Sequence, residues 1–129
     1  MSISQKAIAL GAVLMLLAVG IGAFGAHAFN QLLVNNGRTD IFDTASKYHF
    51  YHGLGLLVVG IILDRHKQLK YTNIIVNLLF YGVIIFSGSL YLLAIFNITW
   101  MGAVTPIGGI CLLFAWGLLG VSLIKLSEC

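Results

Sequence analysis

Long apolar segments without a charged side chain dominate this chain, and they predict transmembrane helices. The run from Tyr71 to Ile124 holds 54 residues without a single Asp, Glu, Lys, Arg or His. That is more than twice the ~20 residues that one crossing of a bilayer requires. A second charge-free run extends from Ala7 to Ala26, and the stretch from Tyr51 to Leu63 carries only His52. The pattern therefore predicts an all-α integral membrane protein.

Turn residues and charges divide these runs into four spans within a single domain, residues 1–129. The turn sequence Asn35-Asn36-Gly37 is followed by Thr39 or Asp40 as a helix N-cap. We therefore expect an interfacial helical extension that continues into the second span without a break. The expected spans of the four-helix bundle are residues 7–29, 45–63, 74–96 and 105–124.

The first apolar run also has features of a secretory signal peptide, because Lys6 precedes it and Ala26-His27-Ala28 follows it. Its apolar part is longer than the ~7–15 residues that form the core of such signals. We therefore favour a retained first span over a cleaved signal.

The distribution of Lys and Arg predicts the orientation of the spans. Residues 64–70 hold three of the seven Lys and Arg residues, whereas residues 97–103 hold none. Loops rich in Lys and Arg stay on the cytoplasmic side. With both termini in the cytoplasm, five of these cations lie inside and two outside. At the start of the fourth span, Thr105 is expected as the N-cap and Pro106 as the first helical residue.

Composition narrows the classes of function. The chain is 60% hydrophobic and 9% charged, which leaves no room for a separate soluble domain. Its net charge of +3 comes from cations at the ends of spans, so nucleic-acid binding is not expected. Since the sequence contains no nucleotide loop, haem-attachment motif or recognisable catalytic set, we expect neither a cofactor nor an enzyme.

Small residues within the spans predict close helix packing. In hydrocarbon, helices associate where small side chains let their backbones approach. Packing within one bundle is the favoured interpretation, and packing between the subunits of a homo-oligomer is the alternative. The glycines expected at such contacts are Gly22, Gly25, Gly88, Gly108 and Gly109.

Three histidines are expected near the outer membrane face. His27 ends the first predicted span, and His49 and His52 lie three residues apart at the start of the second. Two imidazoles on one side of a helix, with a third from the next helix, can bind a metal ion. The favoured interpretation is a network of neutral histidines that hydrogen-bond with Tyr48 and Tyr51. Proton transfer or ligand recognition is the third alternative, since an ionisable residue within a span often serves function.

Hydroxyl groups add further candidates in the third and fourth spans. Ser87, Ser89 and Tyr91 lie within the third span, and Thr105 begins the fourth. A serine nucleophile would need a base, which only a histidine of the second span could supply. Hydrogen bonding of these hydroxyls to helix carbonyls or to a neighbouring helix is therefore favoured.

Several of these residues together resemble a known family. The segments Gly22–Ala28, Tyr51–Leu54, Phe86–Tyr91 and Thr105–Gly109 occur in the order seen in the bacterial YgdD-like family of small membrane proteins. The resemblance covers nearly the whole chain. It implies four spans in the bacterial inner membrane and no established activity. His49 departs from the family pattern, which has glutamine there, so His27 and His52 are the better pair for a metal.

Two hypotheses for function follow. The first is a non-enzymatic structural or assembly component in contact with the lipid bilayer and assembled as a homo-oligomer. The second is a protein that binds or transports a small ligand, a proton or a divalent metal ion through its histidine and tyrosine cluster. The sequence favours the first, because no intramembrane carboxylate is present to couple a cation.

Overall fold

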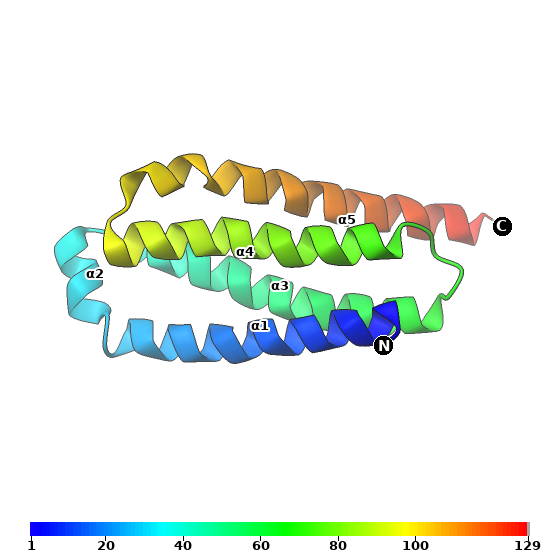
Figure 1. Cartoon of the computed structure of the whole chain (residues 1–129), viewed down its shortest axis with the longest axis horizontal. Coiled ribbons are helices and arrows are strands. Elements are labelled where there is room, and N and C mark those ends of the chain that lie inside the picture. Colours follow the sequence, from blue (N-terminus) through cyan, green and yellow to red (C-terminus); the bar gives the residue numbers. More distant parts are fainter. Residues whose placement is uncertain (129) are drawn as a thin grey trace.

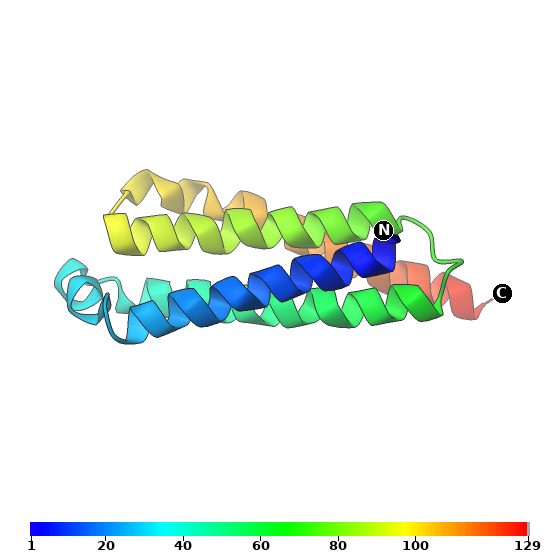
Figure 2. The ribbon, with the colours of Figure 1, turned by 60° about the horizontal axis from the view of Figure 1, so that its bottom comes forward.

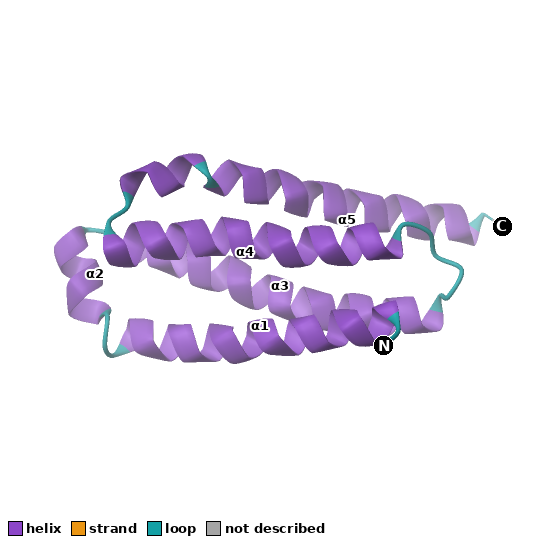
Figure 3. Ribbon diagram, viewed as in Figure 1, coloured by secondary structure: helices purple, strands orange, loops and turns teal. Residues whose placement is uncertain are grey.

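The computed structural model describes residues 1–128, and in this part of the chain the regular structure is entirely helical. The expectation of an all-α membrane protein is confirmed for the fold. Connections between the helices are short (Figure 3). The elements are α1 (Ile3–Ala26), α2 (Asn30–Asn36), α3 (Thr39–Arg65), α4 (Thr72–Phe96), the 3-10 helix η1 (Thr99–Ala103) and α5 (Thr105–Ser127).

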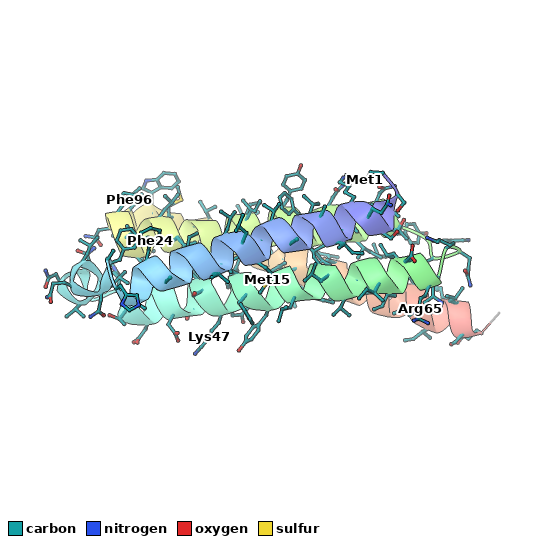
Figure 4. The ribbon with its side chains drawn as sticks, turned by 90° about the horizontal axis from the view of Figure 1, so that it is seen from below. Met1, Met15, Phe24, Lys47, Arg65 and Phe96 are labelled. Carbon is teal, nitrogen blue, oxygen red and sulfur yellow. The ribbon has the colours of Figure 1, made fainter. Side chains whose placement is uncertain are left out.

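The four long helices lie side by side and alternate in direction, so that both termini lie at the same end (Figure 1). In Figure 2, α1 lies with α3 in one layer, and α4 lies with α5 in the other. The main contacts are those of α1 with α3, of α3 with α4 and of α4 with α5. Figure 4 shows Phe24 and Phe96 towards one end, where α2 also lies, and Met1 and Arg65 towards the other.

The helix boundaries differ from the predictions on the α2 side. The short helix α2 was not predicted. It ends at Gly37, which lies in the predicted turn and has a φ of +65°. α3 runs unbroken from Thr39 as predicted, but its N-cap is Arg38, so neither Thr39 nor Asp40 caps it. The helix thus begins six residues before the predicted span at residue 45.

The start of α5 also differs from the prediction. Val104 occupies the N-cap position, and helical residues begin at Thr105 with Pro106 second. The cause is η1, whose last turn leads directly into α5 through a hydrogen bond from the Val104 N–H to the Met101 carbonyl. The Thr105 hydroxyl does not cap α5 and instead donates to the Met101 carbonyl oxygen at 3.3 Å or to another partner.

Glycines let α1 and α3 approach along their whole length. A Cβ added at Gly25 would overlap the ring of Phe42, and one at Gly60 would lie 3.0 Å from the carbonyl oxygen of Ser4. Midway, a Cβ at Gly11 would lie 2.9 Å from the backbone nitrogen of Leu57. Such contacts let two backbones pack closely and gain dispersion energy.

A second close contact joins α4 to α5. A Cβ at Gly108 would overlap the backbone of Phe86, and one at Gly82 would lie 2.9 Å from the side chain of Leu112. The other predicted packing glycines lie more loosely. Gly22 and Gly109 have room for a methyl group, and Gly88 has no atom within 4 Å of that position.

Polar side chains tie the ends of the bundle together. At the end with the termini, the Ser4 hydroxyl donates to Asp64 at 3.2 Å, and the Lys6 ammonium donates to the Asn77 amide oxygen at 3.1 Å. At the opposite end, the Asn36 amide donates to the Ala94 carbonyl oxygen at 3.2 Å. The main apolar core lies between these two polar ends.

Three helical segments are long and apolar enough to cross a membrane, namely Ile3–Ala26, Thr72–Phe96 and the run Thr99–Ser127 that joins η1 to α5. The second predicted span lies in α3, which is not among them. The reason is that α3 carries charged residues near both of its ends and His49 and His52 between them, which lowers its mean hydropathy.

A pair of alanine substitutions tests the α4–α5 contact. Gly108→Ala should lower the free energy of unfolding by about 1–3 kcal/mol, because its methyl group would overlap the backbone of Phe86. Gly120→Ala, on the same helix, is the matched control, since nothing lies within 4 Å of its Cβ position. Unfolding in mixed micelles followed by circular dichroism measures both. Equal stability of the two variants would contradict the close contact.

Candidate functional site

A hydrogen-bonded histidine lies at the centre of the bundle. His52 is thirteen residues from each end of α3, which places it about 20 Å from either end at 1.5 Å per residue. Only 8% of its surface is exposed. On α5, Trp116 lies eleven residues from each end. The indole Nε1–H of Trp116 donates to Nε2 of His52 at 3.0 Å.

The partners of His52 fix its tautomer. An indole N–H can only donate, so Nε2 of His52 accepts and carries no proton. The other ring nitrogen, Nδ1, lies 2.8 Å from the carbonyl oxygen of Tyr48, which can only accept. His52 is therefore neutral with its proton on Nδ1, and both nitrogens are engaged.

The bond between His52 and Trp116 joins two helices that are not neighbours. No Cα atoms of α3 and α5 come within 8 Å of each other. The indole reaches across because α3 has a glycine beside it: a Cβ at Gly55 would lie 3.1 Å from two ring carbons of Trp116. One long side chain thus links the α1–α3 layer to α5.

A second histidine bonds to α4. Nδ1 of His49 lies 2.9 Å from the hydroxyl of Tyr91, and both side chains are buried. Nε2 of His49 and the hydroxyl oxygen of Ser87 are buried without a hydrogen-bond partner. The carbonyl of Leu14 approaches the His49 ring from α1, but it does not meet Nε2 in hydrogen-bonding geometry.

The unpartnered atoms belong to side chains that line one cavity. It has a volume of about 170 Å³ and lies between α1 and α4. His49, Ser87, Gly88 and Tyr91 contribute to its wall, and the rest of the wall is apolar.

The hydroxyls of Ser89 and Thr105 form a separate chain of hydrogen bonds. They lie 2.6 Å apart, and Ser89 is 2.9 Å from the carbonyl oxygen of Phe86. Each hydroxyl has one proton to donate. Either Thr105 donates to Ser89 and Ser89 donates to Phe86, or Ser89 donates to Thr105 and Thr105 donates to the Met101 carbonyl oxygen at 3.3 Å. Both arrangements fix the start of α5 against α4. Ser87 and Ser89 therefore face different surroundings.

The predicted outer cluster of three histidines does not form. His27 is exposed at the end of α1. Because Gly25 lies against Phe42, His49 and His52 are seven and ten residues further along α3, about 10 and 15 Å deeper. The prediction placed the start of the membrane span at residue 45, with both histidines near its outer end. In the structure Phe42 already lies beside Gly25 of α1, so His49 and His52 lie deeper.

The two tyrosines of the predicted cluster lie at the outside of α3. Tyr51 is 61% exposed. Tyr48 is also exposed, and its ring stacks near His52 with centroids 6.0 Å apart and packs on Phe86 at 4.5 Å. Tyr48 thus contributes its carbonyl and its ring to the surroundings of His52, while Tyr51 takes no part.

The predicted metal site finds no support in this geometry. Within residues 1–128, no three His, Cys, Asp or Glu side chains are grouped so that they could hold a metal ion. Of the predicted pair, His27 is at the end of α1, and both nitrogens of His52 are already bonded within the protein.

Sequence reasoning did not find the role of Trp116 as the hydrogen-bond donor to His52. A buried indole N–H usually has a hydrogen-bond partner. That requirement, applied to a tryptophan in the middle of an apolar helix, is the signal that could have pointed to a partner such as His52.

Comparison with known proteins places the chain in a family. Residues 21–109 match the family model described as "Protein of unknown function (DUF423)". A UPF0382 membrane protein of Staphylococcus epidermidis is 43% identical over 124 residues, covering 93% of this chain and 96% of the relative. The UPF0382 membrane protein YwdK of Bacillus subtilis is 39% identical, covering 92% and 95%.

This chain belongs to the UPF0382 membrane protein family. The resemblance inferred from the motifs is confirmed for a membrane protein of unknown function, but the comparisons do not carry the YgdD-like name. No solved structure matches the UPF0382 chain.

Replacement of Trp116 tests the central hydrogen bond. Trp116→Phe keeps an aromatic ring but removes the donor and leaves Nε2 of His52 unpartnered. We expect it to lower the free energy of unfolding by about 1–2 kcal/mol. Trp100→Phe is the control, because Trp100 is 65% exposed in η1. Denaturant titration in mixed micelles compares them, and equal losses would contradict a role for the bond.

Proposed function

We propose that this UPF0382 protein is a non-enzymatic structural or assembly component of the bacterial inner (cytoplasmic) membrane, which it crosses four times as a homo-oligomer. The observation that carries the proposal is an outward-facing glycine on α5. Gly117 is exposed, and no atom lies within 4 Å of its Cβ position.

An apolar groove surrounds this glycine. It lies between α4 and α5, and Leu113, Phe114 and Gly117 contribute to its wall. Glycine destabilises a helix by about 1 kcal/mol relative to alanine. A glycine in such a groove becomes favourable when another helix packs closely against it. A helix from a second copy of the chain is the occupant we propose.

In addition to the three apolar segments, we propose that α3 also crosses the membrane. Its 27 residues correspond to about 40 Å of helix, more than the ~30 Å of the hydrocarbon core. Contacts at Gly25, Gly11 and Gly60 keep it beside α1 from end to end, so a membrane that α1 crosses also encloses α3. The charged residues at its start can extend towards the interface.

The orientation follows from the charges at the two ends. The end with both termini also holds the connection between α3 and α4 (Figure 1). That connection and its flanks include Arg65, Lys67 and Lys70. Under the positive-inside rule this end is cytoplasmic, and α2 and η1 lie outside.

The alternative of transport has less support from the arrangement of polar groups. The polar residues that could line a transport path fall into separate sets. Ser87 lines the α1–α4 cavity, Ser89 bonds to Thr105, and His52 bonds to Trp116. Since these sets do not join into one polar path, we favour the assembly role.

A leucine substitution in the groove tests the proposed assembly. Gly117→Leu should convert the oligomer to monomers without loss of helical fold, because its side chain would enter the groove while its Cβ meets no atom of its own chain within 4 Å. Gly20→Leu is the matched control, since Gly20 on α1 is equally open. Native mass spectrometry measures the subunit number. A monomeric wild type, or an oligomer unchanged in Gly117→Leu, would contradict the proposal.

Accessibility of single cysteines tests the four spans. In a background without native cysteines, Gln31→Cys in α2 and Gln68→Cys after α3 should react with a membrane-impermeant maleimide from opposite sides of the membrane. Labelling of both positions from the same side would mean that α3 does not cross. The same experiment assigns the cytoplasmic side, where Gln68→Cys is expected.

A further inference from the structure

The cavity between α1 and α4 carries an inference beyond the assembly role. α1 supplies Leu14 and Leu17 to its wall, α4 supplies Phe80 and Val83, and His49 closes its α3 side. Because Val13 and Ile84 at its wall are each about half exposed and Gly88 has no side chain, it opens sideways between the two helices.

Two side chains of its wall each carry a buried polar atom that is unsatisfied. His49 is 5% exposed and Ser87 is 2% exposed. Nε2 of His49 and Oγ of Ser87 have no hydrogen-bond partner. A buried polar group without a partner destabilises a protein. Alanine at position 87 would avoid this loss of stability. The serine hydroxyl becomes favourable when a bound molecule forms a hydrogen bond with it.

The wall defines the chemistry of that molecule. No acidic or basic side chain other than His49 lines the cavity, so a charged group would enter without a counter-charge. A hydroxyl both donates and accepts, and so can bond with His49 and Ser87 together. The remaining wall is apolar and suits a hydrocarbon chain. One water needs only ~10–15 Å³ of such volume. Several waters would therefore be needed to fill the 170 Å³, and only two polar atoms are present to bond with them.

We propose that this cavity binds an uncharged, hydroxyl-bearing amphiphile that enters from the lipid phase. Its hydroxyl bonds to Nε2 of His49 and Oγ of Ser87. Its hydrocarbon chain lies along α1 and α4, past Leu17 and Ile84. Tyr91 holds the His49 ring from its other side through Nδ1. The site does not depend on the oligomeric state.

Photolabelling of the whole protein in lipid nanodiscs tests the proposal. The probe is octanol with a diazirine on its alkyl chain. We expect saturable labelling of α1 and α4 residues of the cavity, prevented by excess octanol and not by octane. Ser87→Ala should weaken the apparent affinity about two- to tenfold, the equivalent of one hydrogen bond. Ser122→Ala, at a buried serine of α5 outside the cavity, should leave it unchanged.

Stability without the probe separates binding from a structural role. Ser87→Ala removes an unsatisfied hydroxyl, so its unfolding midpoint should rise while its labelling falls. Octane competing as well as octanol would overturn recognition of the hydroxyl. Labelling unchanged in Ser87→Ala would do the same. Absence of labelled cavity residues, or ordered water that octanol does not displace, would overturn the site itself.

Discussion

Polar groups inside this bundle have no bulk water to bond with, so their partners come from the protein or from a bound molecule. In an apolar environment an unpaired amide, hydroxyl or imidazole costs several kcal/mol. His52 meets that constraint fully, through Tyr48 on its own helix and Trp116 on α5. This bond links α5 directly to α3, although their backbones do not touch and α4 packs against both.

Glycines bring the helices close enough for the hydrogen bond between His52 and Trp116 to form. Gly11 and Gly60 bring α1 against α3, and Gly108 brings α5 against α4. Gly55 then leaves room for the indole beside His52. Close packing and hydrogen bonding therefore support each other: the small residues set the helix separations, and the side chains of His52 and Trp116 span the distance that remains.

Much of the fold could be predicted from the sequence, because charge-free runs such as Tyr71–Ile124 leave few alternatives to membrane helices. The continuous α3 was predicted from helical spacing after the Gly37 turn. Its depth was not, since Phe42 packs beside Gly25 of α1, and His49 and His52 therefore lie in the interior rather than at the expected surface. Which glycines face a helix and which face outward, as Gly108 and Gly117 do, depends on rotations that composition does not encode.

The most direct test of this account is the distance between the nitrogens of His52 and Trp116 in a bilayer. Solid-state NMR of the ¹⁵N-labelled protein measures their dipolar coupling and the protonation of each ring nitrogen. The account predicts a separation near the 3.0 Å seen between Nε1 and Nε2, with the His52 proton on Nδ1. An absent coupling, or a proton on Nε2 of His52, would contradict it.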